Sequence, residues 1–324
     1  MMRAFQRETD WRPAVAAGAA MVMTSGAALA GPLPNEDIWY LPTTDKAASL
    51  YVREVGPPDQ PPVVVLHGGF GAEHSYMLDV IEPLAGKIHF VMYDQRGSLR
   101  SPADPKTNSI DKQVEDLELL RQNLGVDRLT LFAHSMGTFL AFSYLKAHPD
   151  HVANLVLAGT VRAKIPDPVT KATSVSDDDF AMSLTRRPEV LAELRANGLD
   201  KEGLTARQAT HAWRIRFTSV NAMHVERWRS MSGGRVFYNP ETGNAIGATL
   251  PKTWDFEPLL SSGRYKVTVI DGDHDYVDPG QVYWKDFAAR SPQIHLTVLP
   301  NAGHSSWLDE PERFQAALVE GLKP

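Results

Sequence analysis

The sequence predicts an α/β fold: a mostly parallel, doubly wound sheet covered by helices, with a helical segment inserted into it. Residues 51–55 alternate between the two faces as in a strand, and they begin the series of predicted strands. Continuous apolar runs, typical of strands buried on both faces, follow at 62–66, 88–93, 128–133 and 152–158. Apolar residues at helical spacing separate these runs at 110–124 and 138–148. Strands that alternate with helices indicate parallel pairing, because a parallel connection needs a crossover.

The alternation stops after residue 161 and resumes at residue 266. In between, the chain has no buried-strand pattern and is rich in Arg, Glu and Trp, with helical spacing at 188–197 and 204–225. We interpret residues 162–257 as a helical cap that covers the sheet. Strands at 266–270 and 294–299 and helices at 280–289 and 311–322 then complete a core made of residues 31–161 and 258–324.

Composition narrows the classes of function. The chain has 324 residues, no Cys and a formal net charge of -6. The lack of Cys excludes a disulfide framework, a thiolate zinc site, an iron–sulfur cluster and a Cys nucleophile. The negative charge argues against nucleic acid as a partner. No apolar run is long enough for a membrane span in the mature protein, and the oligomeric state stays open.

The N-terminus has the layout of a secretory signal peptide. Three arginines precede an Ala-rich apolar stretch at 14–30, which ends in the cleavage pattern Ala28-Leu29-Ala30. We therefore expect residues 1–30 to be removed after Ala30, and the protein to be secreted or periplasmic. Acidic residues in the first ten positions are atypical of a signal peptide, and the alternative is a helical or disordered extension.

A serine stands at the junction of the strand 128–133 and the helix 138–148. The junction reads AHSMG at 133–137, the context of a nucleophile elbow, in which a tight turn lifts a serine hydroxyl above the sheet. The turn requires small flanking residues, and Gly137 meets this need while Ala133 replaces the usual first glycine. We expect Ser135 to be a nucleophile; the alternative is a serine in a turn with no chemical role.

A serine hydroxyl is a weak nucleophile and needs a base that an acid orients. His304 follows the strand 294–299, and Gly303 leaves its loop free to turn, so we expect His304 to be the base. The order Ser–acid–His places the acid after the strand 266–270. We favour Asp275, with Asp273 as the runner-up, and two further aspartates compete for the role: Asp271 and Asp278.

A glycine-rich segment, HGGFG at 67–71, follows the strand 62–66. Glycines let backbone N–H groups turn toward the negative charge that develops on an attacked carbonyl. We expect Met136 to give one such donor and either Gly69 or Phe70 to give the other. The segment lacks the Lys-Ser/Thr ending of a phosphate loop and the spacing of a dinucleotide site, so no cofactor is expected.

Residues 48–322 resemble the α/β-hydrolase superfamily. The resemblance rests on HGG at 67–69, AHSMG at 133–137, Asp275 and NAGH at 301–304. Within the superfamily the chain looks most like the proline iminopeptidase branch, which carries H-G-G-P-G and D-Q-R-G-x-G-x-S. The corresponding segments here are HGGFG at 67–71 and DQRGSLRS at 94–101, and the ending at 300–314 is also similar. The resemblance implies an α/β-hydrolase fold, a Ser-His-Asp triad and a helical cap.

The chain departs from the branch at several positions. Phe70 replaces Pro, Leu99 replaces Gly, and the elbow resembles those of esterases and C–C hydrolases rather than G-G-S-W-G. The branch also carries W-x-x-W-E, whose Glu binds the substrate's amino group, whereas WRIRF at 213–217 puts Phe217 in that place. A buried ammonium without a carboxylate would cost several kcal/mol. Other acidic residues of the cap can replace that Glu: Glu226, Glu202, Glu241 or Asp255.

For the cap we expect substrate contacts at Trp213, Phe217 and Glu226. Other aromatic residues either pack the cap on the sheet or contact ligand: Trp228, Trp254 and Tyr238. The DQRG segment at 94–97 is expected to build a structural loop. His211 and His224 are thirteen positions apart with no accompanying carboxylate motif, so no metal site is expected.

These observations favour a serine hydrolase that cleaves an ester or amide bond of a small molecule or short peptide through an acyl-enzyme. A proline-iminopeptidase-like exopeptidase and a carboxylesterase or lactonase are alternatives within this class. An acyltransferase stays open as well, since no residue reveals whether water is excluded. A non-catalytic ligand-binding protein on the same fold is the alternative from another class.

Overall fold

The computed structural model describes residues 33–229 and 238–323. The predicted signal peptide, residues 1–30, lies outside the described residues, so its cleavage and the localisation it implies stay predictions.

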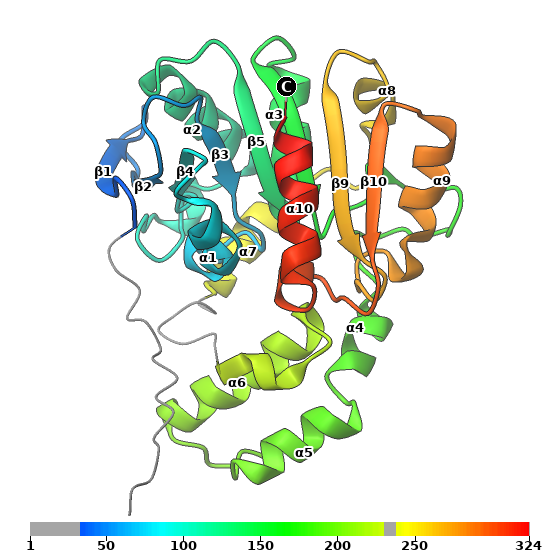
Figure 1. The fold of residues 1–324 in the computed structure, drawn as a ribbon. Coiled ribbons are helices and arrows are strands. Elements are labelled where there is room, and N and C mark those ends of the chain that lie inside the picture. Colours follow the sequence, from blue (N-terminus) through cyan, green and yellow to red (C-terminus); the bar gives the residue numbers. More distant parts are fainter. Residues whose placement is uncertain (1–32, 230–237, 324) are drawn as a thin grey trace, which may run out of the picture. The chain divides into compact units, whose positions relative to one another are not determined.

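An eight-stranded sheet forms the centre of the described chain, in the order β1-β2-β4-β3-β5-β6-β9-β10 (Figure 1). β1 and β2 pair antiparallel with each other, and β2 pairs antiparallel with β4; the remaining neighbours are parallel. The mostly parallel sheet predicted from the sequence is therefore confirmed. Its strands are β1 (Asp37–Pro42), β2 (Ser49–Val55), β3 (Val63–Leu66), β4 (Phe90–Tyr93), β5 (Leu129–His134), β6 (Val152–Ala158), β9 (Lys266–Gly272) and β10 (Ile294–Leu299).

Helices cover both faces of this sheet because successive strand residues point to opposite sides. Val64 and Leu66 of β3 belong to one apolar core, whereas Val63 and Val65 belong to the other. The first core packs against α2 (Ile110–Asn123), α3 (Met136–Ala147), α8 (Glu257–Leu260) and α9 (Val282–Arg290). The second core packs against α1 (Leu78–Ile81) and α10 (Pro311–Leu322).

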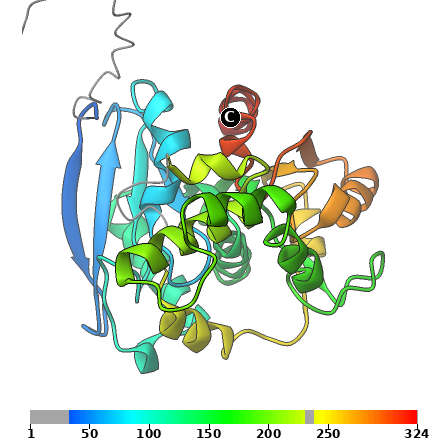
Figure 2. The same cartoon turned by 90° about the horizontal axis from the view of Figure 1, so that it is seen from below.

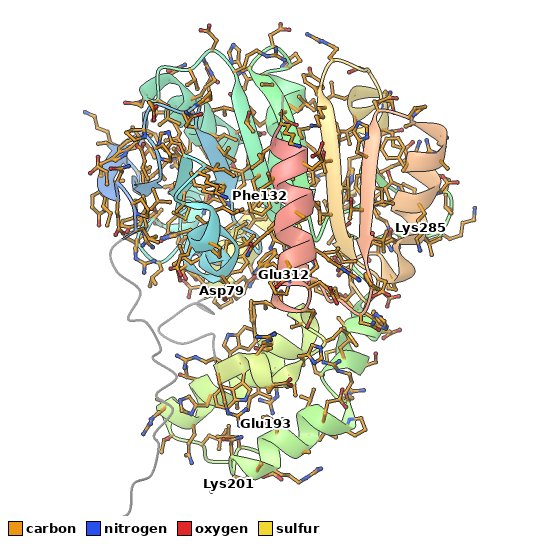
Figure 3. The ribbon with its side chains drawn as sticks, viewed as in Figure 1. Asp79, Phe132, Glu193, Lys201, Lys285 and Glu312 are labelled. Carbon is orange, nitrogen blue, oxygen red and sulfur yellow. The ribbon has the colours of Figure 1, made fainter. Side chains whose placement is uncertain are left out.

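Phe132 illustrates how β5 is held from the second face. Its side chain is fully buried, and its ring centroid lies 6.2 Å from that of Phe314 on α10 (Figure 3). Burial of a Phe side chain stabilises a fold by about 1.5–3 kcal/mol. The strand that leads to Ser135 is thus anchored just before the elbow.

Between β6 and α8 the chain forms a group of helices beyond the carboxyl ends of the central strands (Figure 1), and Figure 2 shows α5 and α6 crossing in front of the core. The helices of this segment are α4 (Asp178–Leu184), α5 (Pro188–Ala196), α6 (Ala206–Asn221) and α7 (Pro240–Gly247). Part of it has an apolar core of its own, formed by Val190, Leu194, Leu199, Ala212, Ile215, Val225 and Trp228. Glu193 of α5, labelled in Figure 3, accepts a hydrogen bond of 2.8 Å from Trp228 Nε1.

The segment also contains two very short strands that the sequence did not predict. Two-residue strands, β7 (Lys164–Ile165) and β8 (Trp254–Asp255), pair antiparallel where the segment leaves the core and returns to it. The amide of Phe256 also donates to the carbonyl of Ala163 (2.8 Å). Strands this short have no periodicity that a sequence pattern could reveal.

The helix α6 begins at a capping box. The Thr205 hydroxyl accepts from the Gln208 amide, and the Gln208 side chain accepts from the Thr205 amide, which satisfies amides that the first helical turn leaves unpaired. The helix ends where Ala222 takes an extended conformation, with φ -140° and ψ 153°. These limits place Trp213, Phe217, Val220 and Asn221 along one face of the helix.

Candidate active site

Ser135 sits in the sharp turn between β5 and α3. Its backbone has φ 55° and ψ -129°, a conformation that non-glycine residues rarely adopt and that costs about 1–3 kcal/mol. The surroundings have no room for larger neighbours. A Cβ at Gly68 would lie 2.6 Å from Ser135 Cβ, and a Cβ at Gly137 would lie 2.5 Å from the Leu66 carbonyl oxygen. Such a turn is what the predicted nucleophile elbow requires.

The side chains of His304 and Asp275 meet at the carboxyl end of β9. His304 Nδ1 lies 2.8 Å from Asp275 Oδ1, and both side chains are buried. Asp275 Oδ1 also accepts from the Val277 amide (2.9 Å). Within the described part of the chain, His304 Nε2 has no hydrogen-bond partner. With Nδ1–H donated to the carboxylate, Nε2 presents a lone pair that can accept a proton.

The other three aspartates of this loop have different partners. Asp273 Oδ1 contacts His274 Nδ1 (2.6 Å) and accepts from the Ala302 amide, so it braces its own loop. Asp278 accepts from the amides of Tyr283 and Trp284 at the start of α9. Asp271 accepts from the Thr160 amide and hydroxyl, both at 3.1 Å. Of these aspartates, the structure brings Asp275, the acid that the sequence favours, to His304.

The glycine loop after β3 is held by His67. The Gln95 amide can only donate, so His67 Nε2 accepts from it (3.0 Å), and Nδ1 carries the proton that binds the Gly68 carbonyl (3.0 Å). Burial lowers the pKa of His67, which keeps the ring neutral. His67 therefore braces the loop.

Three backbone amides are candidates for oxyanion donors. Gly68 is not one of them, because its amide donates to the Tyr76 hydroxyl (2.7 Å). Among the residues with described positions, the amides of Gly69, Phe70 and Met136 have no acceptor. Met136 is the first residue of α3, where the amide points out of the helix end. Gly69 borders the pocket described below, while the Phe70 side chain is buried in the core.

The DQRG segment at 94–97 forms a buried ionic loop. Arg96 binds both carboxylate oxygens of Asp116 (2.9 and 2.7 Å) and one of Asp45 (2.7 Å). Asp94 accepts from His74 Nδ1 (2.6 Å) and from the His74 amide (3.1 Å). Burial by itself would raise the pKa of Asp94, but the His74 hydrogen bond and charge outweigh it and lower that pKa to about 2. None of these side chains lines the pocket.

A pocket of about 280 Å³ opens above Ser135 and His304. Four of its residues come from one face of α6, and Tyr276, next to Asp275, places its ring centroid 4.6 Å from that of His304. None of the described residues that line it is an aspartate or glutamate. Its lining consists of Gly68, Gly69, Ala72, Tyr76, His134, Ser135, Trp213, Phe217, Val220, Asn221, Tyr238, Tyr276 and His304.

The expected cap contacts are met in part. Trp213 and Phe217 line the pocket, with ring centroids 6.0 Å apart. Glu226 does not: its side chain is 64% exposed, lies 3.6 Å from His224 and is absent from the pocket lining. The other acidic candidates also lie elsewhere. Asp255 pairs with Lys164 (2.6 Å), and Glu202 and Glu241 are exposed.

The remaining cap aromatics divide between two roles. Tyr238 lines the pocket. Trp254 packs edge-on against Phe139 of α3, with centroids 5.0 Å apart, so it attaches the segment to the core. Trp228 is buried in the segment's own core.

The end of α6 is tied to the loop that carries His304. The Ser305 amide donates to the Asn221 carbonyl (2.7 Å), and the Ser305 hydroxyl donates to the Asn221 side chain (3.1 Å). Asp309 accepts from the amides of Met223 and Gly303 (2.8 and 2.9 Å). Helical spacing from Trp213 could have revealed Val220 and Asn221, whereas no sequence signal marks Tyr76 or Tyr276 as pocket residues.

Two clusters of metal-ligand type occur among the described residues, and neither lines the pocket. In the first, the Glu73 and Asp94 carboxylates already accept from Arg100 and His74. In the second, which also includes His148 and His151, the Glu118 carboxylate accepts from Arg121 and Tyr144. These donors occupy the oxygens that a cation would need.

In the described chain, no helix combines the length and apolar character that crossing a bilayer requires.

A family model and similar proteins of known name place the chain in the same family. The model of the alpha/beta hydrolase fold matches residues 61–311. A protein named proline iminopeptidase from Lactobacillus helveticus is 37% identical over 302 residues, which cover 84% of this chain and 93% of the relative. The proline iminopeptidase of Xylella fastidiosa strain Temecula1 is 24% identical over 294 residues, covering 84% of this chain and 91% of that protein.

Solved structures agree with this result. The proline iminopeptidase-related protein from Thermus thermophilus superposes with a TM-score of 0.62 at 26% identity, covering 89% of this chain and 97% of its own. A thermophilic esterase from Thermogutta terrifontis, at 23% identity, has the same fold, with a TM-score of 0.63 over 88% of this chain and 97% of its own. The chain therefore belongs to the α/β-hydrolase fold family and, within it, to the proline iminopeptidase branch.

Proposed function

We propose that this hydrolase cleaves an ester or amide bond through an acyl-enzyme on Ser135, with His304 as base and Asp275 as the acid that orients it. One observation carries the proposal. His304 Nδ1 is bound to a buried carboxylate while Nε2 has no partner among the described residues, and His304 shares a pocket with the elbow serine. A neutral imidazole with this orientation is a general base at neutral pH.

The reaction follows from these positions. Ser135 Oγ attacks the substrate carbonyl and gives its proton to His304 Nε2, and Asp275 stabilises the resulting imidazolium. The amides of Met136 and of Gly69 or Phe70 donate to the oxyanion; each such donor is typically worth about 10²–10³ in rate. His304 then protonates the leaving group as the carbon–oxygen or carbon–nitrogen bond breaks. Water, deprotonated by His304, releases the acid and restores Ser135.

The pocket favours substrates whose acyl group is uncharged. Its lining offers Trp213, Phe217, Tyr238 and Tyr276 but no carboxylate from a described residue. Residues 230–237, which the structure does not describe, contain no Asp or Glu in the sequence. A substrate with a free amino terminus would lose its hydration shell without gaining a counter-ion, at a cost of several kcal/mol. A small carboxylic ester or lactone meets no such cost.

Removal of an N-terminal proline is the second candidate. It is supported by the names of the relatives, of which one is 37% identical. Because the apolar lining opposes binding of an ammonium group, we place ester hydrolysis first.

Covalent labelling tests the nucleophile. A fluorophosphonate probe should add one adduct to the full chain, and peptide mass spectrometry should locate it on Ser135. Ser135→Ala should abolish the adduct, whereas Ser143→Ala, a serine farther along α3 that lies outside the pocket, should keep it. Folded wild-type protein that takes no probe would instead indicate a ligand-binding protein on this fold.

A further inference from the structure

A continuous chain of hydrogen bonds joins the glycine loop, the elbow and the His304 loop. The Gly68 amide donates to Tyr76 Oη (2.7 Å), and Tyr76 Oη lies 2.7 Å from His134 Nδ1. His134 Nε2 lies 3.2 Å from the carbonyl oxygen of His304. Tyr76, His134 and His304 are all buried. His134 directly precedes Ser135, so the chain of hydrogen bonds touches the glycine loop, the elbow and the His304 loop, three of the segments that the proposed reaction uses.

The direction of each hydrogen bond is fixed from both ends. The Gly68 amide can only donate, so the Tyr76 oxygen accepts it and the Tyr76 proton is available to His134 Nδ1. The His304 carbonyl can only accept, so His134 Nε2 must carry a proton. In a neutral ring that carries this proton, Nδ1 has a lone pair and accepts from the Tyr76 hydroxyl. Burial, followed by the proximity of His304, holds the pKa of His134 well below its ordinary value, which keeps that ring neutral.

Tight packing keeps these groups in place. The His134 ring centroid lies 4.7 Å from that of His304 and 4.7 Å from that of Trp307. Tyr76 stacks on the same Trp307 at 6.2 Å. A Cβ at Gly159 would lie 2.8 Å from both His134 Nε2 and the His304 carbonyl oxygen. Little movement of one partner is possible without movement of the others.

We propose that Tyr76 and His134 are positioning residues for this reaction, which set the glycine loop and the His304 backbone relative to Ser135. The proposal rests on the proposed function. Both residues border the pocket, but each polar atom of their side chains is already hydrogen-bonded to the protein. They therefore act through the geometry of the groups that react. Misplacement of reacting groups by about 1 Å can cost about 10² in rate.

Tyr76→Phe tests the first half of the chain, because it removes the acceptor of Gly68 and the donor to His134 with little change in shape. We expect kcat for a p-nitrophenyl ester to fall about 10- to 100-fold while KM stays within about twofold. The matched control is Tyr265→Phe, which removes a hydroxyl bound to the Pro149 carbonyl (2.6 Å) just before β9, at the opposite end of that strand from Asp275. It should leave kcat unchanged.

His134→Asn tests the second half. An Asn side chain can still accept from Tyr76, but it is too short to reach the His304 carbonyl, so kcat should again fall about 10- to 100-fold. If the chain acts as a unit, the double variant should be no slower than the slower single variant by more than about threefold. Multiplied losses would mean that Tyr76 and His134 act separately, and would overturn the proposal.

Nitrogen NMR of labelled histidine in the wild-type full chain gives a readout that needs neither activity nor a folded variant. His134 should show protonated Nε2 and unprotonated Nδ1 across pH 6–8. The opposite tautomer would overturn the proposal by itself. An unchanged kcat in Tyr76→Phe with an active wild type would also overturn it, whereas a wild type without Ser135-dependent turnover would overturn the proposed function as well.

Discussion

At the scale of single residues, two buried aspartates near the end of β9 have different hydrogen-bond partners. Asp275 has the His304 ring as its partner (2.8 Å). Asp271 has only the Thr160 amide and hydroxyl. Burial, together with the negative charge of Asp275, raises the pKa of Asp271 well above its ordinary value.

The corresponding amide variants separate the two residues. Asp275→Asn should lower kcat/KM by at least about 10³, because the neutral amide no longer stabilises the imidazolium. Asp271→Asn keeps the shape of a side chain that binds Thr160 rather than His304, and its amide oxygen still accepts from Thr160, so kcat/KM should stay within about twofold. Initial rates on an ester measure both variants. Equal losses would contradict the assignment of the acid.

Gly68→Ala tests the close approach of the glycine loop to the elbow. The new Cβ would lie 2.6 Å from Ser135 Cβ, so either the loop or the elbow must shift. We expect a loss of at least about 10-fold in kcat and a destabilisation of about 1–3 kcal/mol, as overpacked sites usually give. Gly86→Ala is the matched control, because no atom lies within 4 Å of the added carbon. Wild-type kinetics in Gly68→Ala would contradict the described geometry.

At the scale of elements, the core strands and helices follow from the sequence because they bury regular patterns. β6 and β10 and the helix α10 have the limits that the apolar runs predict, and the other predicted core strands and helices differ by a few residues at their ends; the four-residue helices α1 and α8 were not predicted. β1 was missed since it is an edge strand, with Ile38 and Tyr40 exposed, and lacks a buried pattern. α4 and α7 are short and largely exposed, so tertiary contacts rather than periodicity define them.

The loop after β4 should contribute to acid stability through Asp94. Its pKa is lowered to about 2, so it stabilises the fold above about pH 4 and loses that contribution as the pH falls toward 2. A shift of this size is worth about 2 kcal/mol. Asp94→Asn should therefore lower the free energy of unfolding at pH 7 and flatten its dependence between pH 4 and 2, as measured by denaturant titration.

Exposed Asp59 provides the control for this prediction. Asp59→Asn should change the free energy of unfolding by no more than about 0.5 kcal/mol at any pH. An Asp94→Asn variant with the same pH dependence as wild type would show that the His74 contact does not stabilise the carboxylate.

The pocket face of α6 should determine which acyl groups bind. Phe217→Glu puts a carboxylate where the sequence of the iminopeptidase branch has one. The ratio of kcat/KM for a prolyl anilide to that for an uncharged ester should rise at least about 10-fold, because the ammonium gains a counter-ion and the ester loses apolar contact. Leu191→Glu, on exposed α5, is the control and should leave the ratio unchanged. An unchanged ratio in Phe217→Glu would contradict this role of α6.

At the scale of the whole molecule, a parallel sheet brings distant segments to one edge. Ser135, Asp275 and His304 follow β5, β9 and β10, whose carboxyl ends lie at the same side of the sheet. This juxtaposition could be predicted from the sequence, because the serine, the acid and the histidine each follow a predicted parallel strand. The choice between Asp275 and Asp273 could only be favoured, since it depends on a side-chain contact within one loop.

The sequence predicted that a cap exists, but not how its residues are arranged around the pocket. Which of its residues face the pocket depends on how α6 docks on the His304 loop through Asn221 and Asp309. Glu226 illustrates the limit: its residue type suits an ammonium, but its position in the fold leaves it in solvent. Residue types therefore predicted which candidate catalytic side chains come together better than they predicted which cap side chains line the pocket.

The proposed hydrolase mechanism and the selectivity of its pocket are tested most directly by initial rates of the full chain on two substrates, p-nitrophenyl acetate and prolyl-p-nitroanilide, with Ser135→Ala as the blank. The proposed mechanism predicts ester turnover that disappears in Ser135→Ala. The pocket lining predicts a kcat/KM for the prolyl anilide at least about 100-fold lower than that for the ester, since the ammonium group of the anilide meets no carboxylate. Ser135-dependent turnover of the anilide at a comparable or greater rate would contradict the pocket's proposed selectivity. Absence of Ser135-dependent turnover of either substrate would contradict the proposed hydrolase mechanism itself.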